Sequence, residues 1–91
     1  MGRRKRRWGF DDAERAVLLE AAAGMPDLHA LVTRAEQRAE FGGIWLLEAS
    51  VAELDEVYSL VEALMDATRS RKRIDLLEGL LATLCTSMDG Y

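Results

Sequence analysis

The sequence has few of the residues on which catalytic and metal sites are usually built. It contains one cysteine, Cys85, and one histidine, His29. A single thiol excludes an internal disulfide, and one histidine without a second clustered ligand does not complete a metal site. We therefore expect no metal, no cofactor and a reducing, cytoplasmic environment.

Long apolar runs are missing too. No window approaches the roughly 20 apolar residues that a membrane-spanning helix needs. The cationic residues 3–7 lead through Trp8 and Phe10 directly to Asp11, without the apolar segment of a signal peptide. The sequence thus predicts neither secretion nor membrane insertion. Arginine outnumbers lysine and alanine is frequent, which is typical of a GC-rich bacterial or phage genome.

Recognisable catalytic motifs are also missing. His29 has no nucleophile and no orienting group in a suitable pattern, so it is interpreted as a surface or packing residue. Cys85 lies among Leu81, Leu84 and Met88, where a cysteine typically acts as a small apolar filler. No phosphate-binding loop, CxxC pair or HExxH motif occurs. The sequence favours a binding protein over an enzyme, and it indicates no small-molecule substrate.

What the sequence does contain is enough apolar material for one small fold. Of its 91 residues, 49% are hydrophobic, which predicts a folded chain. A chain of this size buries roughly 60 to 65% of its unfolded surface, so its core is small. A core this small is consistent with a fold that is stabilised by a partner protein or by a second copy of the chain. We interpret residues 8–91 as a single helical domain and residues 1–7 as a basic N-terminal arm.

Charge is distributed unevenly along the chain. Residues 11–68 carry thirteen carboxylates against three arginines, although the formal net charge of the whole chain is only −4. The remaining nine cations fall in two clusters, which are the candidate nucleic-acid-binding residues together with Trp8: Arg3, Arg4, Lys5, Arg6 and Arg7, and then Arg69, Arg71, Lys72 and Arg73. The sequence therefore describes a basic arm, an acidic body and a basic turn.

The two basic clusters allow more than one interpretation. Five consecutive cations favour an extended arm that a polyanion neutralises, with Trp8 stacking on bases. A solvated arm, or one that pairs with the acidic body of the same chain, fits the sequence as well. Residues 69–73 also suit the end of a helix, because cations at a helix C-terminus complement its macrodipole.

Four helices are expected, giving a mainly α fold. The first begins at Asp11, which forms a capping box with Glu14, and runs toward Gly24. Pro26 opens the second, whose apolar residues continue at helical spacing until two glycines, Gly42 and Gly43, stop it. Residues 44–48 form a short apolar run that we interpret as a buried strand. Its best mate is the segment 7–10, which would give a short two-stranded β element.

The last two helices carry the widest apolar stripes. Ser50 and Glu53 form a capping box at the start of the third helix. The apolar stripe of this helix does not continue in phase beyond Met65. Either the chain turns near residues 69–73, or one long helix presents its two halves to different partners. We favour the turn, which gives a C-terminal helical hairpin. The stripes supply the candidate protein-interface residues: Leu54, Tyr58, Val61, Met65, Leu77, Leu81 and Leu84.

These observations predict a small protein-interaction module, such as an accessory subunit, adaptor or regulator, that docks a partner protein or a second copy through its amphipathic helices. The alternative is a nucleic-acid-associated protein that binds phosphates through the arm and the 69–73 turn. An acidic inhibitor of phage type, which mimics nucleic acid with its carboxylates, is a further alternative.

Overall fold

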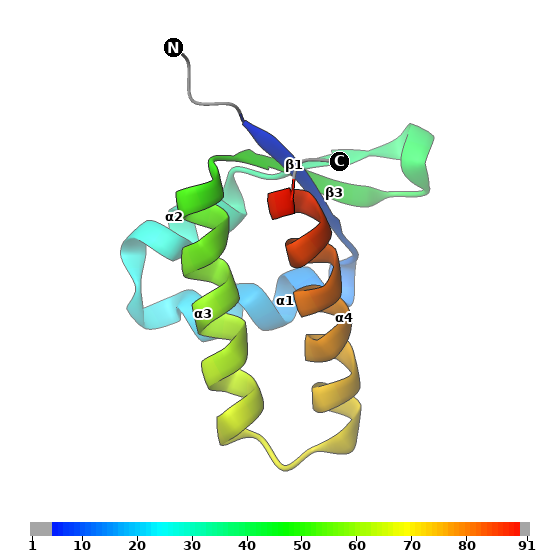
Figure 1. Cartoon of the computed structure of the whole chain (residues 1–91). Helices are drawn as coiled ribbons and strands as arrows, with labels where there is room; N and C mark the ends of the chain where they lie inside the picture. Colours follow the sequence, from blue (N-terminus) through cyan, green and yellow to red (C-terminus); the bar gives the residue numbers. More distant parts are fainter. Residues whose placement is uncertain (1–4, 90–91) are drawn as a thin grey trace.

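A computed structural model describes residues 5–89 of the chain (Figure 1). The described part is mainly helical, as the sequence predicted, and adds a small antiparallel sheet. Two short 3-10 turns, Ala22–Gly24 and Ala39–Phe41, join these elements. In chain order the helices and strands are β1 Arg6–Phe10, α1 Asp12–Ala21, α2 Pro26–Thr33, β2 Glu36–Arg38, β3 Ile44–Ala49, α3 Val51–Ala67 and α4 Arg71–Asp89.

The helix starts follow the capping chemistry of the sequence. The Asp11 carboxylate accepts a hydrogen bond from the Glu14 backbone N–H at 2.8 Å, and the Glu14 carboxylate returns one from the Asp11 N–H. Ser50 and Glu53 form the same reciprocal pair at the start of α3. Because these bonds satisfy amide donors that have no partner inside the helix, both predicted boxes fix where a helix begins.

The sheet joins segments from three parts of the chain. Its strand order is β1-β3-β2, and both pairings are antiparallel. Trp8 pairs with Leu47 and Phe10 with Trp45, which confirms the predicted pairing of the segment 7–10 with the segment 44–48. Gly9 allows this close packing, since a β-carbon at that position would lie only 3.0 Å from the Ile44 side chain.

The prediction for the second helix was wrong beyond Thr33. Helix α2 ends there, and residues 36–38 form strand β2 instead of a continued helix. The Thr33 hydroxyl bonds back to the His29 carbonyl at 2.7 Å, a contact that often accompanies helix distortion. The positive-φ residues Gly42 and Gly43 then turn the chain from β2 into β3, and Gly42 caps the short 3-10 turn Ala39–Phe41 instead of the end of α2.

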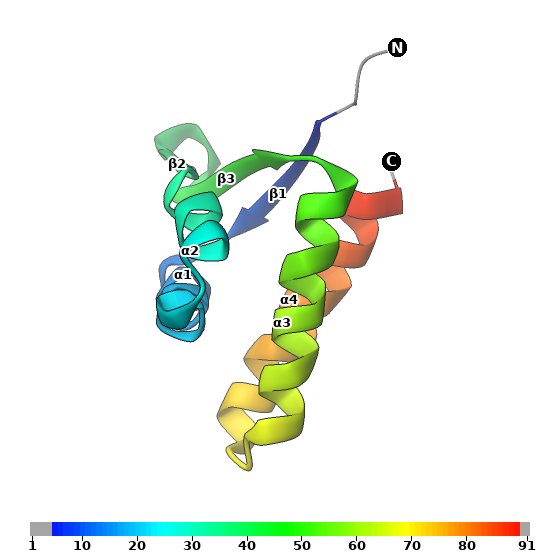
Figure 2. The ribbon, with the colours of Figure 1, turned by 90° about the vertical axis from the view of Figure 1, so that its left-hand side faces the viewer.

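The two long helices form the expected hairpin. Helix α3 ends at Ala67 and α4 begins at Arg71, so the chain turns within residues 68–70. The Ser70 hydroxyl accepts a hydrogen bond from the Arg73 backbone N–H at 3.4 Å, in the first turn of α4. The two helices run side by side and cross one face of the sheet near its β1 edge (Figures 1 and 2).

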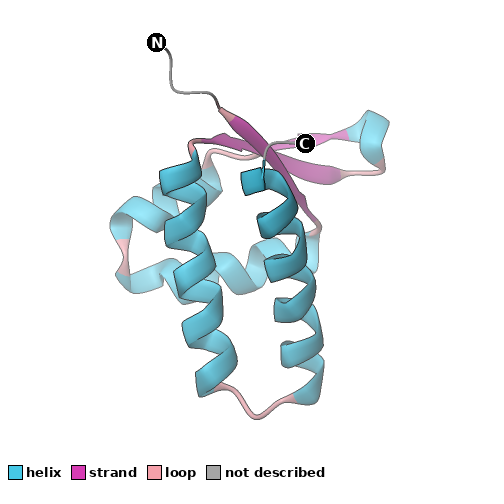
Figure 3. Ribbon diagram, viewed as in Figure 1, coloured by secondary structure: helices cyan, strands magenta, loops and turns pink. Residues whose placement is uncertain are grey.

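The core lies between the sheet and the helices. Trp8 and Phe10 on β1 are each only 1% exposed, and their rings pack with centroids 4.8 Å apart. The Trp8 indole N–H donates to the Thr83 hydroxyl of α4 at 2.9 Å, so its one polar atom is satisfied as well. Figure 3 shows the strands together at one end of the molecule, with the helices extending away from them on one side.

Among residues 5–89, none of the helices is long and apolar enough to cross a membrane.

Candidate functional site

The apolar stripes of α3 and α4 are mostly used inside the chain. Leu54, Val61, Leu77 and Leu84 are 0% exposed, because the two helices pack against each other and against the rest of the core. These four candidate interface residues cannot touch a partner in this fold. The other three candidates are half-buried at the margin of the core: Tyr58, Met65 and Leu81.

Several apolar residues of the hairpin are not fully buried. Besides the three candidates, Leu64, Leu76 and Met88 are half-buried, and Val51 at the start of α3 is exposed. The hairpin thus keeps an apolar margin, while the centres of its two stripes lie in the core.

Cys85 is exposed beside Tyr58, which corrects the expectation of a buried filler. A hydrogen bond to the thiol of Cys85, and the negative charge that the thiolate would carry, raise the pKa of the Tyr58 hydroxyl.

The basic N-terminal segment is partly built into the sheet. Arg6 and Arg7 belong to β1 and pair with Ala49 and Glu48, so these two residues of the expected arm are part of the folded domain. Arg3 and Arg4 lie outside the described residues. Trp8 is buried, which corrects its place among the nucleic-acid-binding candidates, because a ring enclosed in the core cannot stack on a base.

The second basic cluster lies at the beginning of α4 and not at the end of a helix. Arg69 is in the connecting loop, and Arg71, Lys72 and Arg73 occupy the first turn of α4. The dipole interpretation was therefore wrong, since cations near a helix N-terminus oppose the macrodipole. Two of them are balanced by ion pairs, Arg71 with Asp75 at 3.8 Å and Arg73 with Glu20 at 3.3 Å.

The described residues of the two basic clusters do not form one surface. The Arg7 carbonyl accepts a hydrogen bond from the Ser87 hydroxyl, near the C-terminal end of α4. Arg71 begins that same helix sixteen residues earlier, which places it about 24 Å away along the axis. In Figure 1 the α3–α4 loop and the start of β1 lie at opposite ends of the molecule.

The structure instead gathers charged residues on the outer face of the sheet. Side chains alternate between faces along a strand, so the burial of Trp8 and Phe10 directs Arg7 outward. Residues of this outer face are exposed or half-exposed, and the helices lie on the other side (Figure 2). The outer face comprises Lys5, Arg7 and Gly9 at β1, Ile44, Leu46 and Glu48 on β3, and Glu36 and Arg38 on β2.

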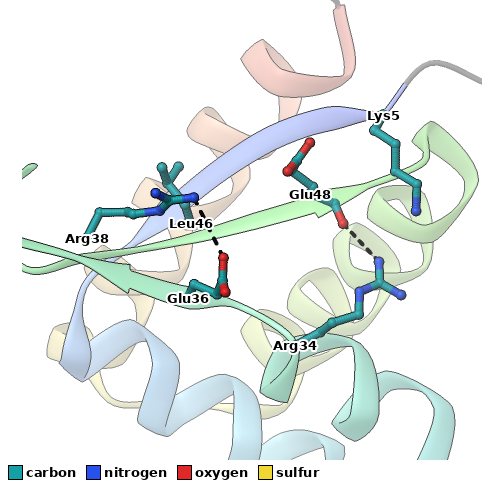
Figure 4. Close-up of a pocket in the computed structure, with 6 residues that line it drawn as sticks. All are labelled: Lys5, Arg34, Glu36, Arg38, Leu46 and Glu48. Atoms are coloured by element: carbon teal, nitrogen blue, oxygen red, sulfur yellow. Dashed lines mark hydrogen bonds and ion pairs between the residues drawn. The ribbon is translucent and has the colours of Figure 1, made fainter.

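An open hollow of about 450 Å³ lies on this outer face. Figure 4 shows Lys5 and Arg34 toward one end of it and Arg38 with Glu36 toward the other, beside Leu46. Six residues line it: Lys5, Arg34, Glu36, Arg38, Leu46 and Glu48. Sequence analysis had proposed only Lys5 among them, because no local pattern shows that Arg34 and Arg38 share a surface with residue 5.

Arg34 is held in position from two sides. Its guanidinium donates to the Glu48 backbone carbonyl at 2.8 Å and lies 3.5 Å from the Glu53 carboxylate. The pKa of Glu53 is lowered from its ordinary value, first by the hydrogen bond from the Ser50 backbone and then by the Arg34 charge. The capping box of α3 is thus linked electrostatically to one end of the hollow.

This link predicts an acid-sensitive contribution to stability. Because the pKa of Glu53 is lower in the folded state, its ionised carboxylate stabilises the fold at pH values above the ordinary pKa of 4.5. This stabilisation is lost as the pH falls through the folded-state pKa. Glu53→Gln keeps a capping-box side chain but no charge, so it should cost up to about 1 kcal/mol at pH 6 and less at pH 3. Urea unfolding at both pH values measures the difference.

Glu14→Gln is the matched control, because Glu14 occupies the same position in the other capping box. Burial raises the pKa of Glu14, with the nearby Asp11 charge adding to the rise. The protonated Glu14 carboxyl therefore stabilises the fold below pH 4.5, and this stabilisation is lost as the pH rises through the folded-state pKa. The pH dependence is thus opposite to that of Glu53. If both substitutions changed stability with pH in the same direction, the lowered pKa of Glu53 would be contradicted.

The remaining chemistry-bearing residues do not converge on a centre. His29 is exposed on α2, and Cys85 is exposed on α4. Within residues 5–89 no group of three or more His, Cys, Asp or Glu side chains is placed to hold a metal ion. Comparisons of the chain with protein-family models, with curated proteins and with solved structures find no match.

Proposed function

We propose that this protein is a non-enzymatic protein-interaction module that docks its partner on the outer face of the sheet. The observation that carries the proposal is the composition of this face. Half-buried Ile44 and Leu46 lie on its central strand, and charged side chains surround them on both neighbouring strands. An apolar centre within a polar rim is the usual anatomy of a protein–protein interface.

The proposal moves the docking surface away from the hairpin. Four of the seven stripe residues are committed to the core, so the helices contribute stability and hold the sheet in place. The sheet face is uncovered by any helix of the described chain (Figure 2). Protein partners commonly occupy such a face, since they bring the side chains that cover its apolar centre.

Other ligand classes fit this face less well. Small-molecule pockets are lined mainly by apolar and aromatic side chains, whereas five of the six residues around the hollow are charged. Glu36 and Glu48 would repel the phosphates of a nucleic acid, and the outer-face residues whose side chains the structure describes include no aromatic ring for base stacking. Nucleic-acid binding remains the alternative hypothesis.

The proposal is tested by comparing two variants that add the same charge in different places. Leu46→Glu alters the centre of the sheet face, and Ala63→Glu alters an exposed position on α3. From nuclease-treated lysate of the source cells, wild type and Ala63→Glu should retain one discrete protein. Leu46→Glu should retain it at least about tenfold less.

Far-ultraviolet circular dichroism should show that both variants are folded. Equal retention of the protein by Leu46→Glu would contradict the proposal, and so would retention of nucleic acid in place of a protein from a parallel lysate without nuclease. Failure of the wild type to retain any discrete protein would contradict it too.

A further inference from the structure

We infer that the partner presents a short acidic segment to the hollow, with its carboxylates on Lys5 and Arg38 and an apolar side chain over Leu46. The inference rests on the proposed function and specifies the chemistry of the partner. It is based on three observations: the balance of charge on this face, the state of each cation around the hollow, and the size of the face.

The outer face is less acidic than the chain as a whole. Around the hollow and along β1 it carries the four cations Lys5, Arg7, Arg34 and Arg38. Glu36 and Glu48 share the face with them, and Glu53 and Glu40 pair with Arg34 and Arg38 at its edges. The whole chain has a formal net charge of −4. An acidic ligand is therefore repelled less by this face than by the rest of the protein, which favours binding here.

The cations differ in how far they are already engaged. Arg34 is fixed by Glu48 and Glu53, so it provides a positive charge in a constant place. Arg38 forms ion pairs with Glu36 at 3.6 Å and with Glu40 at 3.8 Å, but both distances are longer than a hydrogen bond.

The N–H donors of Arg38 can accordingly turn to an incoming carboxylate. Lys5 is exposed and has no ion pair among the described residues.

The dimensions of the face favour a segment over a second copy of the chain. Strand β3 has six residues, which span about 20 Å, and three strands span about 10 Å between their axes. The resulting area of roughly 200 Å² is well below the ~800 Å² that each partner buries in a typical stable complex. A short acidic segment can cover such a face completely and leave the rest of its own protein elsewhere.

The carboxylates of the hollow favour a peptide over a polyphosphate. Glu36 and Glu48 are spaced among the cations, so the face presents both signs. A peptide can place its acidic side chains on the cations and its neutral residues beside the two glutamates. A nucleic acid carries a charge at every nucleotide and cannot avoid them.

The test uses a fluorescein-labelled peptide of repeating Glu-Leu-Glu units and measures its anisotropy with the full chain. The wild type should bind it, with affinity that falls as salt is added. Lys5→Glu and Arg38→Glu should each weaken binding by about tenfold or more. Lys72→Glu makes the same charge change at the opposite end of the molecule and should alter affinity by less than about twofold.

Three results would overturn the inference. They are equal binding of the peptide by Lys5→Glu and Lys72→Glu, absence of binding by the wild type, and tighter binding of a single-stranded DNA probe than of the peptide. Light scattering of the chain alone tests whether a second copy occupies the face. If the wild type self-associates and Lys5→Glu abolishes the association, the face is a self-assembly interface instead. If a protein is retained through Leu46 but the peptide does not bind, the proposed function stands and the acidic-segment inference fails.

Discussion

Replacing Trp8 with alanine should destabilise the protein by about 3–5 kcal/mol, the range for large aromatic truncations in cores. Trp8 is 1% exposed, packs against Phe10 and donates to the Thr83 hydroxyl, so the substitution removes apolar contacts and leaves a cavity. Small domains are stable by only about 5–15 kcal/mol, so much of that margin should be lost. Urea unfolding followed by circular dichroism measures the change.

Arg7→Ala is the control, because it alters the neighbouring position on the exposed face of the same strand. It should change stability by no more than about 0.5 kcal/mol. A Trp8→Ala variant as stable as wild type that had lost binding to DNA or RNA would restore Trp8 as a ligand-contacting residue. That result would contradict the position of its ring in the core.

Leu77→Ala should destabilise the hairpin by about 2–5 kcal/mol at every protein concentration. Leu77 is 0% exposed in the core to which α3 and α4 both contribute, so its truncation leaves a cavity inside one chain. Because the contacts are intramolecular, unfolding midpoints should not move on dilution. Thermal unfolding over a hundredfold range of concentration measures this.

Leu81→Ala is the comparison, since Leu81 is half-buried one helical turn further along α4. It should cost less than Leu77→Ala, because part of its side chain already contacts water. If Leu81 lay between two copies, its truncation would matter more at high concentration, where the copies associate. Such concentration dependence would indicate that the docking surface lies on the hairpin.

The elements with strong local signals were predicted from sequence. Each capping box requires only residues three apart, and the phase change of the apolar stripe after Met65 is visible in one continuous segment. The structure confirms both capping boxes and the hairpin. The β1–β3 pairing was also accessible, because two short apolar runs in a largely helical chain have few alternatives for burial.

The end of α2 was not predictable in the same way. Ala35 and Ala39 continue the helical spacing, and alanine has the highest intrinsic helix propensity, so the local signal favours a longer helix. The chain leaves the helix to complete the sheet with β2, which depends on contacts with β3 that no local pattern encodes. Tertiary pairing overrides the local preference at these residues.

The candidate site was missed for a related reason. Lys5 is distant in sequence from Arg34 and Arg38, and each of the three appears there as an ordinary surface cation or as part of another cluster. Only the sheet brings them around one hollow. Conversely, the run at residues 69–73 is conspicuous in sequence, but the structure separates it from the N-terminal cations by the length of α4.

Site-specific photo-crosslinking tests most directly whether the sheet face is the docking surface. A photoreactive residue at Glu36 lies on the outer face without removing a cation, and one at Ala63 lies on the exposed side of α3. In the source cells, position 36 should give a discrete protein adduct and position 63 should give none. Adducts from position 63 alone, or nucleic-acid adducts in place of protein at position 36, would contradict the account.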